Sequence, residues 1–176
     1  KKYKLPENYI LFVGALEPNK NALNLVRAFE NLKSKDLFLV LVGKGKSYKQ
    51  QILKEINLMG IKERVIFYDY ISTEDLPGIY QMAKLFVFPS FFEGFGIPII
   101  EALFSRTPVI TTKGHCFPES GGPSTLYVDT SKPMEISLAI RRVLENSGLA
   151  KEMTEKGWEY VQKFRPEKTN KRIIEI

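Results

Sequence analysis

The chain has 176 residues, 44% of them hydrophobic, with 26 Lys and Arg against 20 Asp and Glu and a formal net charge of +6, which suits one soluble-type globular domain with its own core. A single cysteine, Cys116, excludes an internal disulfide, and a single histidine, His115, leaves too few ligands for an ordinary zinc site, so we expect no structural metal. No apolar run approaches the ~20 residues of a membrane span, and the first residues lack the features of a signal peptide, so we expect a cytoplasmic protein.

Short apolar runs recur along the chain and predict strands that are buried on both faces. They are residues 9–14, 37–43, 65–68, 85–90, 108–112 and, more weakly, 126–128. Stretches with helical periodicity alternate with or follow them, at 21–34, 48–60, 74–84, 98–105, 134–146, 149–163 and 167–176. Pro77 predicts that the third helix begins after it or is kinked there. This alternation predicts an α/β fold with a parallel sheet, right-handed crossovers and helices on both sides.

In open parallel sheets the ligand lies outside the carboxyl ends of the strands, where the strand order reverses. The loops that follow the strands therefore hold the candidate residues. The first of these loops contains Gly14, which lets the backbone turn sharply, and Lys20, a cation suited to a phosphate. The second, GKGKS at residues 43–47, lacks the spacing of a Walker loop and is more typical of a tight strand-to-helix turn.

The fourth strand leads into FFEGFGIPIIEAL, residues 91–103. Gly94 and Gly96 allow the backbone to approach a ligand, and Pro98 suits the first position of a helix. The free N–H groups at this helix start, together with the positive end of the helix dipole, predict an anion site suited to a diphosphate. Glu101, one turn inside the helix, is expected to point its carboxylate toward the same site.

The spacing of Glu93 and Glu101 carries little information, because three other glutamate pairs in the chain share it. Their context is more specific, since a buried strand precedes them and two glycines and a helix start lie between them. A loop acid and a helix-start acid favoured by the dipole remain an alternative interpretation. His115 and Cys116 lie in another loop at the same edge, where lining the cleft explains them without a catalytic role, since no partner for a nucleophile is visible.

The residues described above make the chain resemble the C-terminal half of the family 4 retaining glycosyltransferases, which have the GT-B architecture. The resemblance runs from Tyr9 to the end and is carried by YILFVGALEPNKN, LVGKG, VIFYDYIS, the long segment from EDLPGIYQ to PVITT, and FRPEKT. LEPNKN is similar to the LEPRKN of the mannosyltransferase-like branch. The resemblance implies a Rossmann-like three-layer α/β/α sandwich, with residues 1–8 as the remnant of an interdomain linker, 9–163 as the nucleotide-sugar-binding domain and 164–176 as a C-terminal helical tail.

The resemblance also implies roles for individual residues. Glu93 would lie beside the donor sugar, and Lys20 would neutralise the diphosphate as the leaving group departs, where charge builds up in the transition state. The other donor-binding residues act through backbone groups that meet the hexose and the phosphates, apart from the Glu101 carboxylate, which would accept hydrogen bonds from the ribose. This donor-binding set is Gly14, Gly94, Phe95, Gly96, Ile97 and Glu101.

Two positions depart from the family pattern. Ala15 follows the first-strand glycine, where many members carry an arginine, and Asn19 replaces the arginine of LEPRKN. Of the two cations that the family pattern leads us to expect, Lys20 is present, and Lys44 is a candidate to replace the missing one. Asp69 stands where a glycine is common, in the loop that usually meets the base, so the choice of base stays open.

The resemblance implies a retaining transferase, independent of metals and cofactors, that moves a hexose from a nucleoside diphosphate to a saccharide or lipid-linked acceptor. GDP-mannose is the favoured donor, and UDP- and ADP-hexoses are alternatives. The acceptor would bind through an N-terminal domain outside this chain, through which the full-length protein would also reach the cytoplasmic face of a membrane. We expect the isolated domain to bind nucleoside diphosphate weakly and to transfer nothing.

Two alternatives stay open on the sequence. A non-enzymatic basic α/β module would bind nucleic acid or a protein partner, yet the cations are scattered among acids rather than interleaved with aromatic residues, so we expect no nucleic-acid partner. Another GT-B relative, such as a sugar phosphorylase or an epimerase, is not excluded, because a fold does not fix the chemistry that it supports.

Overall fold

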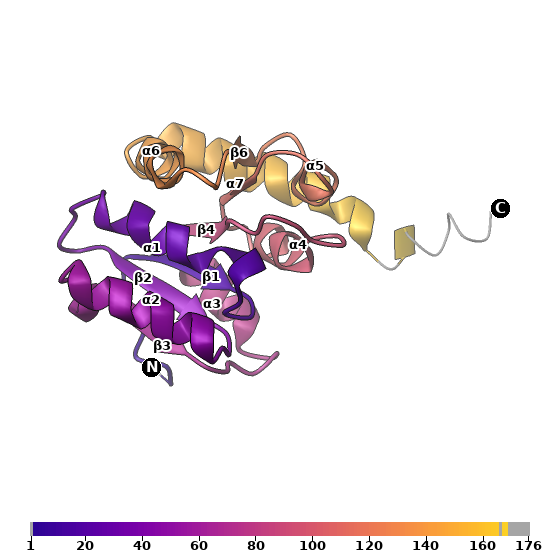
Figure 1. Ribbon diagram of the computed structural model, residues 1–176. Coiled ribbons are helices and arrows are strands. Elements are labelled where there is room, and N and C mark those ends of the chain that lie inside the picture. The colour runs from indigo at the N-terminus through magenta and orange to yellow at the C-terminus, as the bar shows by residue number, and fades with distance from the viewer. Residues whose placement is uncertain (1, 166, 169–176) are drawn as a thin grey trace.

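A computed structural model describes residues 2–165, 167 and 168, and its six strands form one parallel sheet (Figure 1). The strand order is β3-β2-β1-β4-β5-β6, so it reverses between β1 and β4. The strands are β1 (Tyr9–Val13), β2 (Phe38–Val42), β3 (Val65–Tyr68), β4 (Leu85–Phe88), β5 (Val109–Thr112) and β6 (Leu126–Val128). Each lies within a predicted apolar run, and the predicted α/β fold with a parallel sheet is confirmed.

The apolar runs are continuous because both faces of the sheet are covered. In β1, Ile10 and Phe12 pack into one buried cluster, whereas Tyr9 and Leu11 pack into a second cluster on the opposite face. All four side chains are fully buried. Successive side chains of a strand point to opposite faces, so a strand between two layers of helices needs apolar residues at every position.

Helices form the two outer layers, as predicted for a three-layer sandwich. Those on the first cluster are α1 (Ala22–Glu30), α2 (Ser47–Leu58) and α6 (Pro133–Leu144). Those on the second are α3 (Leu76–Met82), α4 (Ile97–Phe104) and α5 (Phe117–Gly121). The long helix α7 (Ser147–Val161) places Met153 in the first cluster and Val161 in the second. Within the described part of the chain, no helix is both long and apolar enough to cross a bilayer.

Some predicted details were wrong. The segment after β5 was expected to be a loop, but it contains α5, whose five residues are too few to show helical periodicity. Helix α3 begins one residue before Pro77 rather than after it, because a proline in the first helical turn removes no intrahelical hydrogen bond. The helix predicted at 167–176 lies almost wholly outside the described residues.

Both flanking segments pack onto the domain. At the N-terminal side, the Asp75 carboxylate accepts hydrogen bonds from Lys2 Nζ at 2.6 Å and from the Tyr3 hydroxyl at 2.7 Å. At the C-terminal side, Phe164 ends a short 3-10 helix, η3 (Gln162–Phe164), and packs against the second cluster. The predicted boundary between residues 163 and 164 therefore falls inside an ordered turn.

Candidate functional site

Lys20 and Glu93 meet where the strand order reverses. Lys20 ends the 3-10 helix η1 (Pro18–Lys20), which follows β1, and Glu93 lies in the loop that follows β4. Lys20 Nζ is 2.6 Å from Glu93 Oε1, and the two side chains are only 19% and 14% exposed. A lysine has three N–H donors, so the hydrogen bond to Glu93 leaves two that can reach a bound anion.

Backbone contacts hold these two loops together. The Asn19 carbonyl accepts hydrogen bonds from the Phe91 N–H at 2.9 Å and from Ser90 Oγ at 3.1 Å. Ser90 is fully buried, and its own carbonyl accepts a 2.5 Å hydrogen bond from Thr112 Oγ1 at the end of β5. The residues on either side of the Lys20–Glu93 ion pair are therefore fixed to each other and to the sheet.

Helix α4 starts beside this ion pair, at Gly96. Gly96 has φ +89°, and a Cβ there would lie 3.1 Å from Ser120 Oγ and 3.2 Å from Ile99 Cδ1, which explains the glycine. Ile97 is the first helical residue, so Pro98 takes the second position and not the predicted first. The Ile99 N–H donates to the Gly96 carbonyl at 3.0 Å, so it is not a free donor as expected.

Fewer free donors thus remain at the helix start than the sequence predicted. Pro98 has no N–H, and within the described residues the N–H groups of Gly96 and Ile97 donate to no acceptor. Gly94 is exposed, with open space where a Cβ would be. The Phe95 ring packs edge-on against Phe164 at 5.5 Å, so η3 supports the loop that joins Glu93 to α4.

Glu101 pairs with a buried tyrosine of α3. Its Oε2 accepts a 2.9 Å hydrogen bond from the hydroxyl of Tyr80 on α3, a side chain that is 1% exposed. Burial, with a smaller effect of the nearby Glu101 carboxylate, raises the pKa of Tyr80 well above its ordinary value, so the hydroxyl remains a donor. Tyr80 holds the Glu101 carboxylate toward α3, and the expectation that it points toward the start of α4 stays a prediction. The sequence offered no signal for this partner.

A hollow of about 290 Å³ opens beside Glu101, between α3 and α4. Its other lining residues are Thr73, Leu76, Pro77, Tyr80, Gln81, Phe104 and Ser105. Neither Lys20 nor Glu93 is among the described residues that line it. The two glutamates of the motif therefore occupy different environments, one against a lysine and one at the edge of a mostly apolar hollow.

The GKGKS segment is a tight turn, as the sequence indicated. A Cβ on Gly43 would lie 1.9 Å from the Gly14 carbonyl oxygen, and a Cβ on Gly45 would lie 2.5 Å from Leu16 Cβ. Gly14 in turn donates its N–H to the Val42 carbonyl at 2.9 Å. These glycines let the loops after β1 and β2 pack directly on each other.

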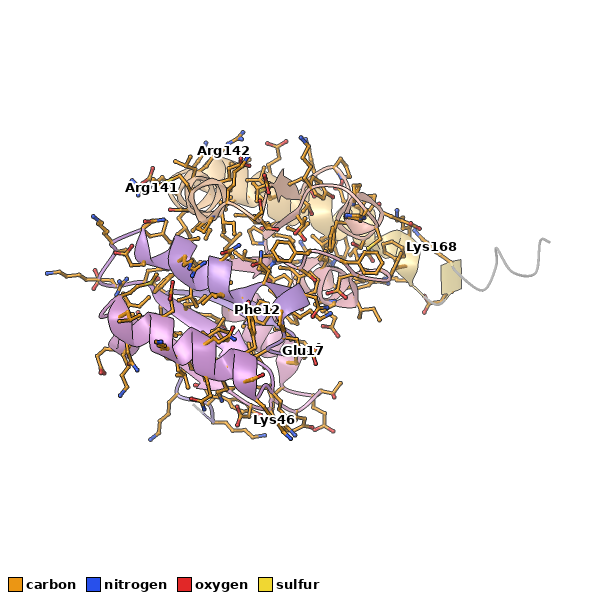
Figure 2. All side chains as sticks on the ribbon, in the orientation of Figure 1. Phe12, Glu17, Lys46, Arg141, Arg142 and Lys168 are labelled. Carbon is orange, nitrogen blue, oxygen red and sulfur yellow. The ribbon has the colours of Figure 1, made fainter. Side chains whose placement is uncertain are left out.

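Lys44, the candidate for a second cation, is exposed and lines a groove of about 590 Å³ with Glu17, Lys46 and Asp69. Figure 2 shows two residues of this groove, Glu17 and Lys46, on the opposite side of the view from the basic residues Arg141 and Arg142 of α6. Lys20 is not among the described residues that line this groove, and a role for Lys44 as the second cation stays a prediction.

His115 and Cys116 lie between β5 and α5, next to the loop that carries Glu93. Cys116 Sγ donates a 3.2 Å hydrogen bond to the Glu93 carbonyl, and the His115 ring meets the Phe92 ring edge-on at 5.8 Å. Burial raises the pKa of the Cys116 thiol above its ordinary value, which disfavours the nucleophilic thiolate. Across residues 2–165, 167 and 168, no group of three or more His, Cys, Asp or Glu side chains is placed to hold a metal ion.

Comparison with known proteins identifies the family. The family described as Glycosyl transferases group 1 matches residues 1–160. The O-antigen chain mannosyltransferase B of Escherichia coli is 31% identical over 167 residues, which cover 93% of this chain and 44% of that protein. The chain thus spans less than half the length of this relative.

Solved structures share the fold. The crystal structure of the C-terminal domain of a group 1 glycosyl transferase from Francisella tularensis superposes with a TM-score of 0.81 at 22% identity, covering 92% of this chain and 88% of that one. Anabaena HepE in complex with UDP-glucose gives a TM-score of 0.87 at 22% identity over 95% of this chain and 47% of that one. The chain therefore belongs to the group 1 glycosyltransferase family and corresponds to the C-terminal domain of its members.

Proposed function

We propose that the chain is the donor-binding domain of a retaining glycosyltransferase that moves a hexose from a nucleoside diphosphate to a saccharide or lipid-linked acceptor. The observation that carries this proposal is the Lys20–Glu93 ion pair at the switch point of the sheet, with the start of α4 beside it. Family membership supports it. GDP-mannose is the proposed donor, which the mannosyltransferase relative supports, and the UDP-glucose complex of HepE supports a nucleotide sugar more generally.

In this proposal Lys20 binds the diphosphate and Glu93 binds the hexose. The two remaining N–H donors of Lys20 bind the diphosphate, while Glu93 Oε2 stays available for a hydroxyl of the hexose. When the bond between the sugar and the diphosphate breaks, negative charge builds up on the departing phosphate oxygen. A lysine that is already fixed near this oxygen stabilises the charge without reorganisation. The N–H groups of Gly96 and Ile97 add donors for the phosphates.

The nucleoside occupies the hollow between α3 and α4. Glu101 lies at its edge with a carboxylate that Tyr80 orients, and a carboxylate is a natural acceptor for the two hydroxyls of a ribose. The aliphatic surfaces of Leu76 and Pro77 provide a wall against which a flat base packs. In this proposal the diphosphate lies between the nucleoside and the sugar.

The acceptor binds elsewhere in the whole protein. The chain covers 44% of the E. coli relative, and we propose that the remaining part of such a protein supplies the acceptor site. The isolated chain then binds nucleoside diphosphate without catalysing transfer. Transfer should be measured on the full-length protein, with GDP-mannose, UDP-glucose and ADP-glucose as donors, and it should be fastest with GDP-mannose.

Isothermal titration calorimetry of the chain with GDP, UDP and ADP tests the proposed donor site. We expect saturable binding of all three nucleotides, with GDP the tightest. If none of the three binds saturably at about millimolar ligand, the weak end of specific affinities, the assignment of the site is wrong. A gel shift with random-sequence RNA serves as the control for a general attraction to anions, and we expect it to be negative.

A further inference from the structure

Asn21 occupies a backbone conformation that few residues tolerate. It joins η1 to α1 with φ +57° and ψ +29°, in the left-handed region, and it is only 3% exposed. Glycine and asparagine are the residues that adopt this conformation most readily. Its N–H donates to the Pro18 carbonyl at 3.1 Å, which closes the turn that ends at Lys20.

Asn21 joins η1 to α1, but the hydrogen bonds of its side chain go to loops rather than to either helix. Within the described part of the chain it makes no capping hydrogen bond to α1, the usual task of an asparagine at this position. Its amide Nδ2 instead donates to the Pro89 carbonyl at 3.1 Å and to the Thr130 carbonyl at 2.8 Å. The amide thus uses both of its N–H groups to join the loops that follow β1, β4 and β6.

These contacts bracket Lys20. On one side the Asn19 carbonyl accepts from the backbone of Phe91, and on the other the Asn21 amide donates to Pro89. Both partners belong to the short segment that leads into Glu93, so hydrogen bonds on either side of Lys20 connect its loop to the segment that carries the carboxylate.

We propose that Asn21 is a positioning residue, which holds Lys20 at the distance from Glu93 and from the bound diphosphate that the reaction requires. This inference rests on the proposed function. Lys20 has a long flexible side chain, and a cation stabilises developing charge only when its place is fixed beforehand. Without the Asn21 amide, the turn that ends at Lys20 keeps its contact through Asn19 alone.

Asn24 provides a matched control. Its Nδ2 donates to the Thr130 carbonyl at 3.2 Å and to the Ser131 carbonyl at 3.4 Å, so it shares one acceptor with Asn21. Neither of these contacts reaches the segment that precedes Glu93. Asn24→Ala therefore removes an amide that joins α1 to the loop after β6 while leaving the link between the loops after β1 and β4 in place.

The test compares GDP with guanosine on the chain and its variants, by calorimetry or by NMR titration. Asn21→Gly keeps the left-handed backbone accessible and deletes both amide donors. We expect this variant to bind GDP about tenfold more weakly and guanosine within about twofold of the wild type, because the diphosphate loses a charge-assisted contact and the nucleoside loses nothing. Asn24→Ala should leave both affinities within about twofold.

A purely structural role would change the two affinities together. Equal losses for GDP and guanosine in Asn21→Gly, or the same selective loss in Asn24→Ala, would overturn the positioning role. Thermal unfolding of each variant confirms that it is folded, and Asn21→Ser replaces Asn21→Gly if the glycine variant does not fold, with the same expected selectivity. If the wild-type chain binds neither GDP nor guanosine, the proposed function itself fails, an outcome distinct from loss of selectivity in the variants alone.

Discussion

Lys20 and Glu93 are 73 positions apart in the sequence, yet Lys20 Nζ lies 2.6 Å from Glu93 Oε1 in a site where both side chains are largely shielded from solvent. They meet because β1 and β4 are neighbours at the point where the strand order of the sheet reverses. A partly buried ion pair of this kind depends on both partners, since removing one leaves the other charge without compensation. Substitutions of either residue should therefore change the binding of a diphosphate at this site.

Lys20→Met should separate phosphate binding from nucleoside binding. The substitution keeps the aliphatic stem and removes the charge, so we expect GDP to bind at least about tenfold more weakly and guanosine within about twofold of the wild type. Lys44→Met is the matched control, because Lys44 is exposed and lines a different groove. Calorimetry of both ligands measures the effect. Equal losses for GDP and guanosine in Lys20→Met, or an equally selective loss in Lys44→Met, would count against the assignment.

Tyr80→Phe should act on the nucleoside. The variant retains the buried ring and removes the hydroxyl that donates to Glu101 Oε2. The carboxylate is then free to turn away from the hollow, so the affinities for GDP and guanosine should both fall by about threefold to tenfold, the net value of about one ordinary hydrogen bond. Unchanged affinity for guanosine, measured by NMR titration, would show that Tyr80 does not orient the ribose contact.

Gly96→Ala should destabilise the fold. The alanine would have to adopt φ +89°, and its Cβ would crowd Ser120 Oγ and Ile99 Cδ1, so we expect a loss of about 1–3 kcal/mol in the free energy of unfolding. Gly94→Ala is the control, since a Cβ at Gly94 meets open space, and it should change stability by less than about 0.5 kcal/mol. Urea unfolding of the two variants checks the contrast. Similar values for both would mean that the helix start tolerates a side chain.

Asp75 should make stability depend on acidity. Hydrogen bonds from Lys2, Ser72 and Tyr3 hold its pKa well below the ordinary value of 3.8, so the carboxylate favours the folded state above that value. This contribution is lost as the pH falls below about 4 toward the lower folded-state pKa. The stability gap between the wild type and Asp75→Asn should therefore narrow from about pH 5 to about pH 2. Urea unfolding at both pH values tests this, and a constant gap would contradict it.

The sheet was predictable from the sequence because each strand is buried on both faces and therefore reads as an uninterrupted apolar run. Phe12 and Leu11 face opposite helical layers, and both are fully buried among apolar side chains. The meeting of Lys20 and Glu93 was predictable at the level of the sheet edge, because each follows the carboxyl end of a strand. Their direct contact was not, since it depends on which strands are neighbours.

The hydrogen bonds between distant side chains could not be predicted from the local sequence pattern. The Tyr80 hydroxyl pairs with Glu101 across two helices, and nothing in the periodicity of α3 distinguishes a buried tyrosine with a partner from one without. An asparagine just before a helix, such as Asn21, is typical of a helix cap. That its amide donates instead to the loops after β4 and β6 follows only from the positions of those loops in the fold. Side chains that join distant loops are set by tertiary packing, which a single sequence does not display.

Titration of Glu93→Gln and of the wild-type chain with GDP shows whether Glu93 lies beside the bound diphosphate. Glutamine keeps an oxygen that accepts a hydrogen bond from Lys20 Nζ, but it removes the negative charge that would lie close to a diphosphate bound there. We expect GDP, which lacks the hexose, to bind Glu93→Gln about threefold or more tighter than the wild type, with a smaller gain at high salt. Unchanged or weaker binding of GDP would contradict the claim that Lys20 and Glu93 form one site for the diphosphate and the sugar.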